Sequence, residues 1–455
     1  MCYKICGNTG KNMSDKRSLE YAERLSRLIK CETVSSYGDT DLSKFYKFHE
    51  LLKLEFPSLF AICDIEDFSG SILLRWKGKN EDLLPILLMN HHDVVEATGS
   101  WTHPPFSGEI ADGKVWGRGT LDTKGGLWGM LQAADELASE GFIPARDVYF
   151  LSTCCEETTG SGADTVSSVL LERGIRFAMV LDEGGMILDE PMSGAKGRYA
   201  MVGVGEKGYT DLKFTARSNG GHASTPGKNT PLVRLGKFMD AAEKKQVFKV
   251  KMSPTVRATL VSLSTSMSGP LKFVLGHPKL FSPLLCKVMP SISGAAGAML
   301  KTTLAFTMAH GSDGCNVLPE EAYVIGNMRY SHHQGGKASI EAISGLAAKF
   351  DIETEVIHGG FDSPLSSHES SAFKLVRRAV DATFEGVRTA PYVMNAASDS
   401  RYMSRVCDNC LRFAPFAISS TQLASVHGID ENVDVDTLAP AVDFYRYIIS
   451  EAQDV

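Results

Sequence analysis

Acidic and imidazole side chains follow three apolar runs of this sequence, at the points where predicted strands end. The runs cover residues 83–89, 148–155 and 177–181, and they lead into His91-His92-Asp93, Glu156-Glu157 and Asp182-Glu183. In an open α/β sheet, ligands bind just beyond the carboxyl ends of the strands. We therefore expect these side chains to meet in one site.

Two more groups in the sequence suit the same site. Asp122 ends the turn that begins at Gly117, directly before a predicted helix, and His427 lies near the C-terminus. Carboxylate and imidazole ligands without a thiolate suit a catalytic Zn²⁺, Mn²⁺ or Co²⁺ better than a structural zinc ion. Each motif alone is a weak signal, but their occurrence at successive strand ends predicts a metal site.

The elements that must position these groups alternate between helix and strand. The apolar spacing predicts helices over residues 18–31, 123–139 and 162–172, with the buried strands between them. This order is typical of an open, mostly parallel sheet covered by helices, so the predicted fold class is α/β.

A different pattern begins near Gly208. Residues 210–216 alternate between apolar and polar, and they are followed by a predicted helix (231–245), strands (301–309, 320–330 and 352–357) and a second helix (339–349). We expect a catalytic domain made of residues 1–207 and 361–455, interrupted by a smaller α+β domain of residues 208–360. Residues 252–300, rich in Pro, Ser, Gly and Leu, do not fit that smaller layer.

The composition excludes several classes of function. The 455 residues include 47 Lys and Arg against 54 Asp and Glu, a net charge of −7 that provides no basic field for nucleic acid. No stretch approaches the ~18 apolar residues of a membrane helix, and the N-terminus lacks the apolar run of a signal peptide. We expect a cytoplasmic protein with no nucleic-acid and no membrane partner.

The motifs resemble, in the same order, those of the M20 family of cocatalytic zinc aminoacylases and carboxypeptidases. The matching segments include LLMNHHDVVEA, FSGEIADGKVWGRGTLDTKGG, STCCEETTGSGA, VLDEGG, GGHASTP, NVLPEEAYVIGNMRY, SDSRY and VHGIDENV. The resemblance covers nearly the whole chain and is to the group of carboxypeptidase S, aminoacylase-1 and glutamate carboxypeptidase. It implies a zinc-hydrolase catalytic domain with an inserted ferredoxin-like lid and dimerisation domain, and hence a homodimer.

The resemblance also implies a set of five metal ligands for two Zn²⁺ per subunit, with Mn²⁺ or Co²⁺ as possible replacements. His91 and Glu183 would bind one ion, His427 and Glu157 would bind the other, and Asp122 would bridge the two. Asp182 stays open as an alternative to Glu183. The peptide bond after the bridging residue, Asp122-Thr123, is expected to be cis.

Further roles follow from the same resemblance. Glu156 would be the general base that takes a proton from a water whose pKa the metal ions lower. Asp93 would orient His91, and His92 would be a packing residue. His222 would stabilise the oxyanion, often from a partner subunit, and the substrate contacts would come from Asn316, Arg329, Ser400 and Arg401. Ala396 and Ala397 precede the loop of residues 398–401, where the family commonly has Gly.

These roles predict a hydrolase that cleaves the amide bond preceding a C-terminal free amino acid. Small peptides are the first expected substrate, which would make the protein a carboxypeptidase or dipeptidase. An N-acyl amino acid amidohydrolase is the alternative, and a non-catalytic carboxylate-binding module is a remote one. The GxGxxG segment at Gly203–Gly208 is followed by strand-like alternation rather than a helix, which disfavours a dinucleotide site.

Overall fold

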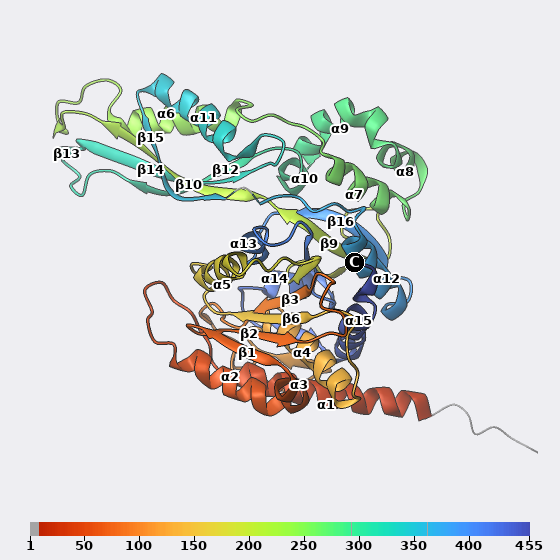
Figure 1. Ribbon diagram of the computed structural model, residues 1–455. Coiled ribbons are helices and arrows are strands. Elements are labelled where there is room, and N and C mark those ends of the chain that lie inside the picture. The colour runs from red at the N-terminus through yellow and green to blue at the C-terminus, as the bar shows by residue number, and fades with distance from the viewer. Residues whose placement is uncertain (1–8, 293, 362) are drawn as a thin grey trace, which may run out of the picture.

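The computed structural model describes residues 9–292, 294–361 and 363–455, and it consists of a large central sheet and a smaller sheet beyond it (Figure 1). The central sheet has ten strands, with β16 (Arg388–Met394) paired to β9 beside the main path. The main path runs, in order, through β1 (Asp64–Phe68), β2 (Ser71–Trp76), β6 (Val148–Thr153), β3 (Ile86–His91), β7 (Met179–Asp182), β17 (Cys410–Arg412), β9 (Arg198–Glu206), β8 (Ile187–Asp189) and β18 (Ala417–Ile418).

The strands that lead to the predicted site are parallel. β3 pairs in parallel with β6 on one side and β7 on the other, and β7 pairs in parallel with β17. The outer strands β1 and β2 are antiparallel, as are the pairs of β9 with β17 and with β8, so the sheet is mixed. The predicted α/β class is confirmed, with antiparallel strands added at the edges.

Successive side chains of the central strands point to opposite faces of the sheet, and both faces are buried. Leu88 and Phe150 belong to the core under α1 (Thr9–Lys30), α4 (Lys124–Ser139), α12 (Ser371–Thr383) and α15 (Leu438–Ser450). Leu87, Tyr149 and Leu151 point to the other face, into a core shared with α5 (Ser161–Glu172) and α13 (Ser400–Met403). Because both faces are covered, these strands are continuous apolar runs, as is typical of parallel sheets.

Shorter elements complete this part of the molecule. They are the helices α2 (Ser43–Glu55), α3 (Pro57–Ile62) and α14 (Ser420–Ser425), and a three-stranded sheet of β4 (Ile110–Ala111), β5 (Lys114–Trp116) and β19 (Asn432–Asp434). The pairing of β5 with β19 brings the turn that follows β5, which ends at Asp122, next to the C-terminal segment that contains His427.

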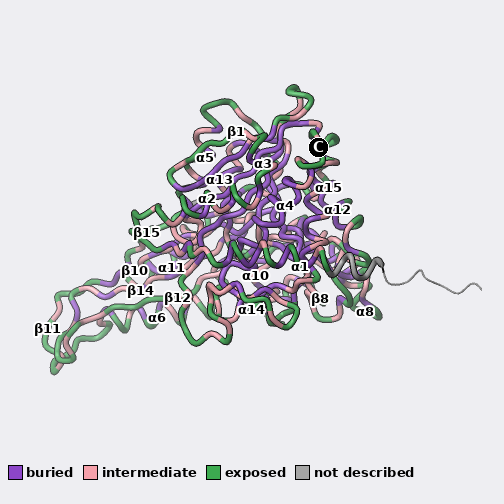
Figure 2. The backbone as a smooth tube through the Cα atoms, turned by 90° about the horizontal axis from the view of Figure 1, so that it is seen from below, coloured by how far each residue is buried: buried purple, intermediate pink, exposed green. Residues whose placement is uncertain are grey.

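The smaller sheet is antiparallel and has its own core. Its strands, in order, are β12 (Thr303–His310), β14 (Glu321–Tyr330), β10 (Gly208–Arg217) and β15 (Glu353–Phe361), and its helices are α6 (Pro231–Lys244) and α11 (Gly335–Ala347). Phe214 and Phe238 lie in the core between this sheet and these helices. A short ribbon of β11 (Gly221–His222) and β13 (Val317–Leu318) lies at the far end of this part, where the chain is largely exposed (Figure 2).

The described residues of the segment 252–300 form four helices that pack on the central sheet rather than on the smaller one. The helices are α7 (Pro254–Ser264), α8 (Gly269–Gly276), α9 (Pro278–Ile292) and α10 (Gly294–Ala298). Their buried side chains, such as Leu260 and Leu285, share a core with Tyr199 and Met201 of β9 and Ala390 of β16. In the described part of the chain, no helix is both long and apolar enough to cross a bilayer.

Candidate active site

Asp122 lies between two imidazoles, with one carboxylate oxygen facing each. Its Oδ1 is 3.0 Å from Nε2 of His91, and its Oδ2 is 3.0 Å from Nε2 of His427. Glu157 Oε2 is 3.1 Å from the same nitrogen of His427. The two histidines therefore face opposite oxygens of one carboxylate, which is the arrangement that a ligand bridging two metal ions requires.

The donor set fits metal ions in its chemistry and its geometry. One ligand atom each from His91, Asp122 and Glu157 lies within 4.8 Å of the others. Oε1 of Glu157 is buried without a hydrogen-bond partner among the described residues. Two donor atoms that share one Zn²⁺ at ~2 Å lie about 3 Å apart, as the imidazole and carboxylate atoms do here. The residues present could therefore hold the predicted ions.

The electrostatics of the cluster also favour a bound cation. Burial raises the pKa of Glu156 and Glu183 well above their ordinary values and raises that of Glu157, and neighbouring carboxylates add to each shift. Hydrogen bonding to Asp122 and Glu157 raises the pKa of His427 to about 10. Several buried carboxylates at one point repel each other unless cations neutralise them.

The structure favours Glu183 over Asp182 as the fifth ligand. Both carboxylate oxygens of Asp182 accept backbone N–H groups, one from Glu183 at 2.9 Å and one from Ser400 at 2.8 Å. Glu183 is surrounded by the charges of Asp122, His91 and Glu157, which all act on its pKa. Asp182 thus holds the loop with both of its carboxylate oxygens, and Glu183 stays the predicted fifth ligand.

Glu156, the predicted general base, lies beside the cluster. Its Oε2 is 4.0 Å from Nε2 of His91, and its side chain is 12% exposed. The loop that carries Glu156 and Glu157 follows β6 through Cys155, which has a left-handed φ of 68°. This turn brings both carboxylates to the same end of the sheet as His91.

Asp93 does more than the sequence analysis assigned to it. Its carboxylate accepts the backbone N–H groups of Glu156 at 3.1 Å and Glu157 at 3.2 Å, and a hydrogen bond from the Ser35 hydroxyl at 2.6 Å. The nearest partner of His91 Nδ1 is the backbone carbonyl of Asp93 at 2.9 Å, with the Asp93 carboxylate at 3.5 Å. Asp93 therefore positions the loop of the predicted base as well as the imidazole.

The remaining expectations around His91 are met. His92 is buried against Phe45 and Phe48, and its Nδ1 is 2.8 Å from the Ser152 hydroxyl, so it is a packing residue. The Asp122-Thr123 peptide bond is cis.

Glu431 holds the loop of Asp122, a role that the sequence analysis missed. Its buried carboxylate accepts hydrogen bonds from the backbone N–H groups of Gly119, Leu121 and Asp122 at 2.8–3.1 Å. It also forms an ion pair with the guanidinium of Arg118 at 2.7 Å. The VHGIDENV segment contains Glu431, but no local pattern indicates that its partners lie more than 300 residues earlier.

Asp399 lies within the predicted SDSRY loop, but its burial beside the predicted base was not expected from the sequence. Its Oδ2 accepts a hydrogen bond from the Thr153 hydroxyl at 2.7 Å, and burial raises its pKa to about 7. Its charge also raises the pKa of Glu156. The carboxylate of Asp399 therefore belongs to the electrostatic environment of Glu156.

Glu206 holds the loop of Ser400 and Arg401, and it lies in the GxGxxG segment Gly203–Gly208. Glu206 at the end of β9 accepts hydrogen bonds from the backbone N–H of Ser398 at 2.9 Å and from its hydroxyl at 3.0 Å. The Ser400 hydroxyl is buried, 2.8 Å from that of Ser398. The segment Gly203–Gly208 is strand on both sides of Lys207, so it carries no phosphate-binding turn.

The predicted substrate-binding residues fall into two groups. Arg329 and Arg401 form the first group, near Tyr209. The guanidinium of Arg329 lies 4.9 Å from the centre of the Tyr209 ring. Burial raises the pKa of Tyr209, whereas the charges of both arginines lower it. His222 and Asn316 lie together on the β11–β13 ribbon, where the Ala223 N–H donates to the Asn316 carbonyl at 2.9 Å. That ribbon is the exposed tip of the smaller sheet, remote from the central sheet (Figures 1 and 2).

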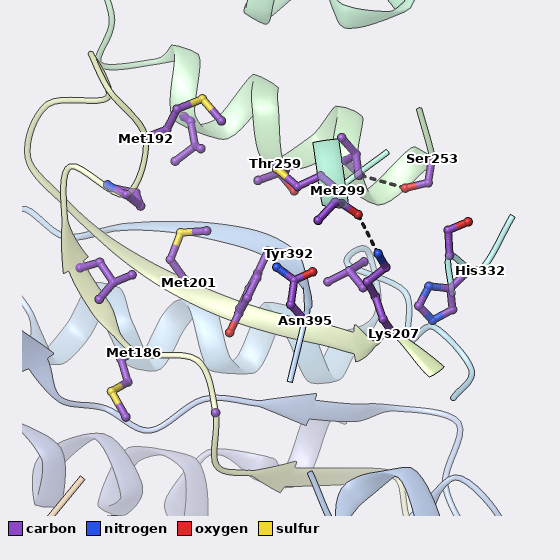
Figure 3. A pocket seen from close by; sticks show the side chains of 18 of the residues that line it. Met186, Met192, Met201, Lys207, Ser253, Thr259, Met299, His332, Tyr392 and Asn395 are labelled. Atoms are coloured by element: carbon purple, nitrogen blue, oxygen red, sulfur yellow. Dashed lines mark hydrogen bonds between the residues drawn. The ribbon is translucent and has the colours of Figure 1, made fainter. Parts of the chain in front are cut away.

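An apolar cavity of about 310 Å³ adjoins the site (Figure 3). It begins at Gly184, next to Glu183, and its wall includes Met186, Met201 and Tyr392 from the central sheet. Val256, Thr259 and Leu263 of α7 close the other side, so residues 252–300 supply part of the wall. Burial raises the pKa of Tyr392, and the charge of Glu183 adds to this rise.

Comparison with known families defines the class of protein. Residues 87–451 match the model of peptidase family M20/M25/M40, and the chain belongs to this family. It is a metallopeptidase or amidohydrolase of the M20 type, as the motifs predicted.

Individual relatives show which members of the family the chain resembles. The chain is 32% identical to the probable carboxypeptidase S-like 2 of Dictyostelium discoideum over 450 residues, covering 96% of this chain and 85% of that protein. It is 30% identical to the human N-fatty-acyl-amino acid synthase/hydrolase PM20D1 over 449 residues, covering 96% and 89%. The M20 family metallo-carboxypeptidase Sso-CP2 from Sulfolobus solfataricus has a similar fold, with a TM-score of 0.67, 16% identity and coverage of 94% and 98%.

Proposed function

We propose that this protein hydrolyses the amide bond preceding a C-terminal free amino acid at a centre of two metal ions. The observation that carries the proposal is Asp122, whose two oxygens each lie 3.0 Å from a different imidazole, that of His91 and that of His427. His91 and Glu183 would hold one ion, His427 and Glu157 would hold the other, and Asp122 would serve both.

The residues around the centre suit this reaction. When bound, the ions would lower the pKa of a water and polarise the substrate carbonyl. Glu156 accepts the proton from that water and donates it to the leaving amine nitrogen, so the amide C–N bond breaks and a carboxylate and a free amino acid form. Arg329 and Arg401, on the same side of the molecule as Tyr209, supply positive charge for the carboxylate of that amino acid.

The acyl side of the substrate has two candidates. Small peptides are supported by the carboxypeptidase S-like relative. An N-acyl amino acid with a long acyl chain is supported by the apolar cavity of about 310 Å³ beside Glu183 and by the relative named N-fatty-acyl-amino acid synthase/hydrolase. An unbranched chain suits the apolar side chains of this wall, such as Met186, Met201 and Leu263, whereas Lys207, His332 and Asn395 add polar groups to the same cavity.

A panel of dipeptides, short-chain N-acyl and long-chain N-acyl amino acids tests the proposal by release of free amino acid. We expect release that a chelator abolishes, with the fastest turnover on long-chain substrates. Val256→Phe narrows the cavity and should slow long-chain turnover by about tenfold or more while sparing short chains. Val261→Phe, on the exposed side of α7, is the matched control. Release that survives complete metal removal would refute the proposal, and equal effects of both substitutions would refute the role of the cavity.

A further inference from the structure

One segment of the chain has a charge opposite to that of the whole. Residues 246–312 contain seven Lys and Arg and no Asp or Glu, within a chain of net charge −7. Nothing inside the segment neutralises this charge. It includes α7 to α10, the helices that pack on β9 and β16. Four of the seven cations, Arg257, Lys272, Lys279 and Lys287, lie on these helices, which form a basic layer on an otherwise acidic molecule.

The outer ridge of α9 in this layer is apolar. Leu280, Leu284, Val288 and Ile292 are four residues apart, and they are 69%, 52%, 41% and 71% exposed. Side chains at this spacing line up along one side of a helix. The opposite side of α9 is already packed, because Leu285 and Met289 are buried in the core shared with β9. The exposed side chains of the ridge therefore take no part in packing α9 on the sheet.

Cations flank the apolar ridge. Lys279 and Lys287 directly precede Leu280 and Val288, and both lysines are exposed. On α8, Lys272 lies between Leu271 and Phe273, which are 47% and 55% exposed. In Figure 1, α8 and α9 form the outermost layer of this side, beyond α7. We call these residues of α8 and α9 the α8–α9 face.

A groove beside this face adds the guanidinium of Arg257. The groove has a volume of about 560 Å³, and its wall includes Arg257, His277, Lys279 and His368 together with Leu280. Guanidinium and ammonium groups next to an exposed leucine suit a ligand with an anionic head and an apolar chain.

We propose that the α8–α9 face docks on the surface of an anionic phospholipid bilayer. The apolar ridge would enter the boundary between head groups and acyl chains, and the lysines would extend to the phosphates. A second copy of this chain is a poor occupant, because the two basic layers would repel each other. The ridge is aliphatic and lysine-flanked rather than rich in Trp, Tyr and Arg, which disfavours a protein interface. This inference goes beyond the proposed function and does not depend on it. It departs from the expectation of no membrane partner, which considered only membrane-spanning and signal segments and not a docking surface.

Flotation of the whole chain with vesicles tests the docking. We expect the protein to float with vesicles of phosphatidylcholine and phosphatidylserine, not with vesicles of phosphatidylcholine alone, and to dissociate at high salt. The triple variant Lys272→Gln, Lys279→Gln and Lys287→Gln should lower the partition coefficient on the order of a hundredfold. Leu280→Ser with Leu284→Ser should also abolish flotation.

A matched triple variant controls for net charge. Lys228→Gln, Lys349→Gln and Lys374→Gln remove the same charge from exposed positions outside the segment, and this protein should float like the wild type. Absence of flotation for the wild type, or equal losses in the two triple variants, would overturn the proposal. A dimer in vesicle-free solution that Leu280→Ser with Leu284→Ser dissociates would also overturn it, since the face would then join two copies.

Discussion

At the scale of single residues, the site depends on carboxylates that are buried close together. Glu156, Glu157 and Glu183 each have a pKa raised by burial and by neighbouring carboxylates. A bound cation reverses this effect, because it stabilises the charged form of each group. The same buried environment keeps Glu156 basic enough to accept a proton once the ions are present.

Replacing the predicted base separates catalysis from metal binding. In Glu156→Gln, the Glu156 N–H still donates to Asp93, so the loop and the ligands keep their places. We expect an unchanged metal content and a turnover reduced by at least ~100-fold, in line with the usual contribution of a general base. Metal analysis and steady-state kinetics measure the two quantities. Glu172→Gln, an exposed change on α5, is the control, and near-normal turnover in Glu156→Gln would exclude this residue as the base.

A pair of variants tests the choice of the fifth ligand. Glu183→Gln should lose one of the two metal ions, because the neutral amide is a weak ligand. Asp182→Asn should retain both ions but lower the stability, since Asp182 accepts backbone N–H groups from Glu183 and Ser400. Metal content per chain distinguishes the two. If Asp182→Asn loses an ion and Glu183→Gln does not, the fifth ligand is Asp182 rather than Glu183.

At the scale of elements, the meeting of His91, Asp122 and Glu183 at one end of the sheet was predictable, because each lies next to an element with a clear apolar pattern. His91 ends β3, Asp122 precedes α4 and Glu183 follows β7, and all three elements are marked by long apolar patterns. Parallel pairing then brings the strand ends together without further information. The same patterns predicted the helix at α6 and the strands β10, β12 and β14 to within a few residues.

Contacts between distant parts of the chain were not predictable. Glu431 bonds to residues 118–122, and Asp93 bonds to residues 156 and 157, pairs that no local pattern connects. Helix α9 contains Pro283 and Pro290, which are unfavourable inside helices, and its packing on β9 outweighs that cost. The helices of residues 252–300 therefore looked irregular in the sequence.

The Glu431 contacts predict that both the stability of the protein and its metal binding depend on how this residue holds the loop of Asp122. In Glu431→Gln the buried Arg118 guanidinium loses its charged partner, which should lower the free energy of unfolding by about 3–5 kcal/mol. The affinity for metal should fall as well, because the loop positions Asp122. Denaturant titration of the chelated protein measures the first effect. Glu109→Gln removes an exposed carboxylate near the same loop and should change little; an equally stable Glu431→Gln would contradict this role.

At the scale of the whole molecule, the position of His222 bears on assembly. It lies on the exposed ribbon at the tip of the smaller sheet, where the Ser224 hydroxyl is its nearest polar partner at 2.7 Å. A histidine in that place can contribute to a reaction only if another subunit or a large domain movement brings it to a metal centre. The homodimer predicted from the family resemblance would supply such a second subunit.

Mixing two inactive variants tests that proposal. His222→Ala chains and Glu156→Gln chains should each be inactive, and their mixture should regain about a quarter of the wild-type rate. Half of the re-formed dimers would be mixed, and one of their two sites would have both residues intact. Subunit exchange followed by the amino acid release assay measures the recovery. A monomeric mass in solution, or no recovery after proven exchange, would contradict action between subunits.

The most direct test of the central claim is a titration of the fully chelated protein with Zn²⁺, in which bound metal and amino acid release are measured together. We predict that release begins only after metal is added and reaches its plateau at two ions per chain, and that His91→Ala and His427→Ala each lower the number of bound ions by one. Full activity in the metal-free protein, or a plateau unaffected by either histidine, would contradict a hydrolase built on this pair of ions.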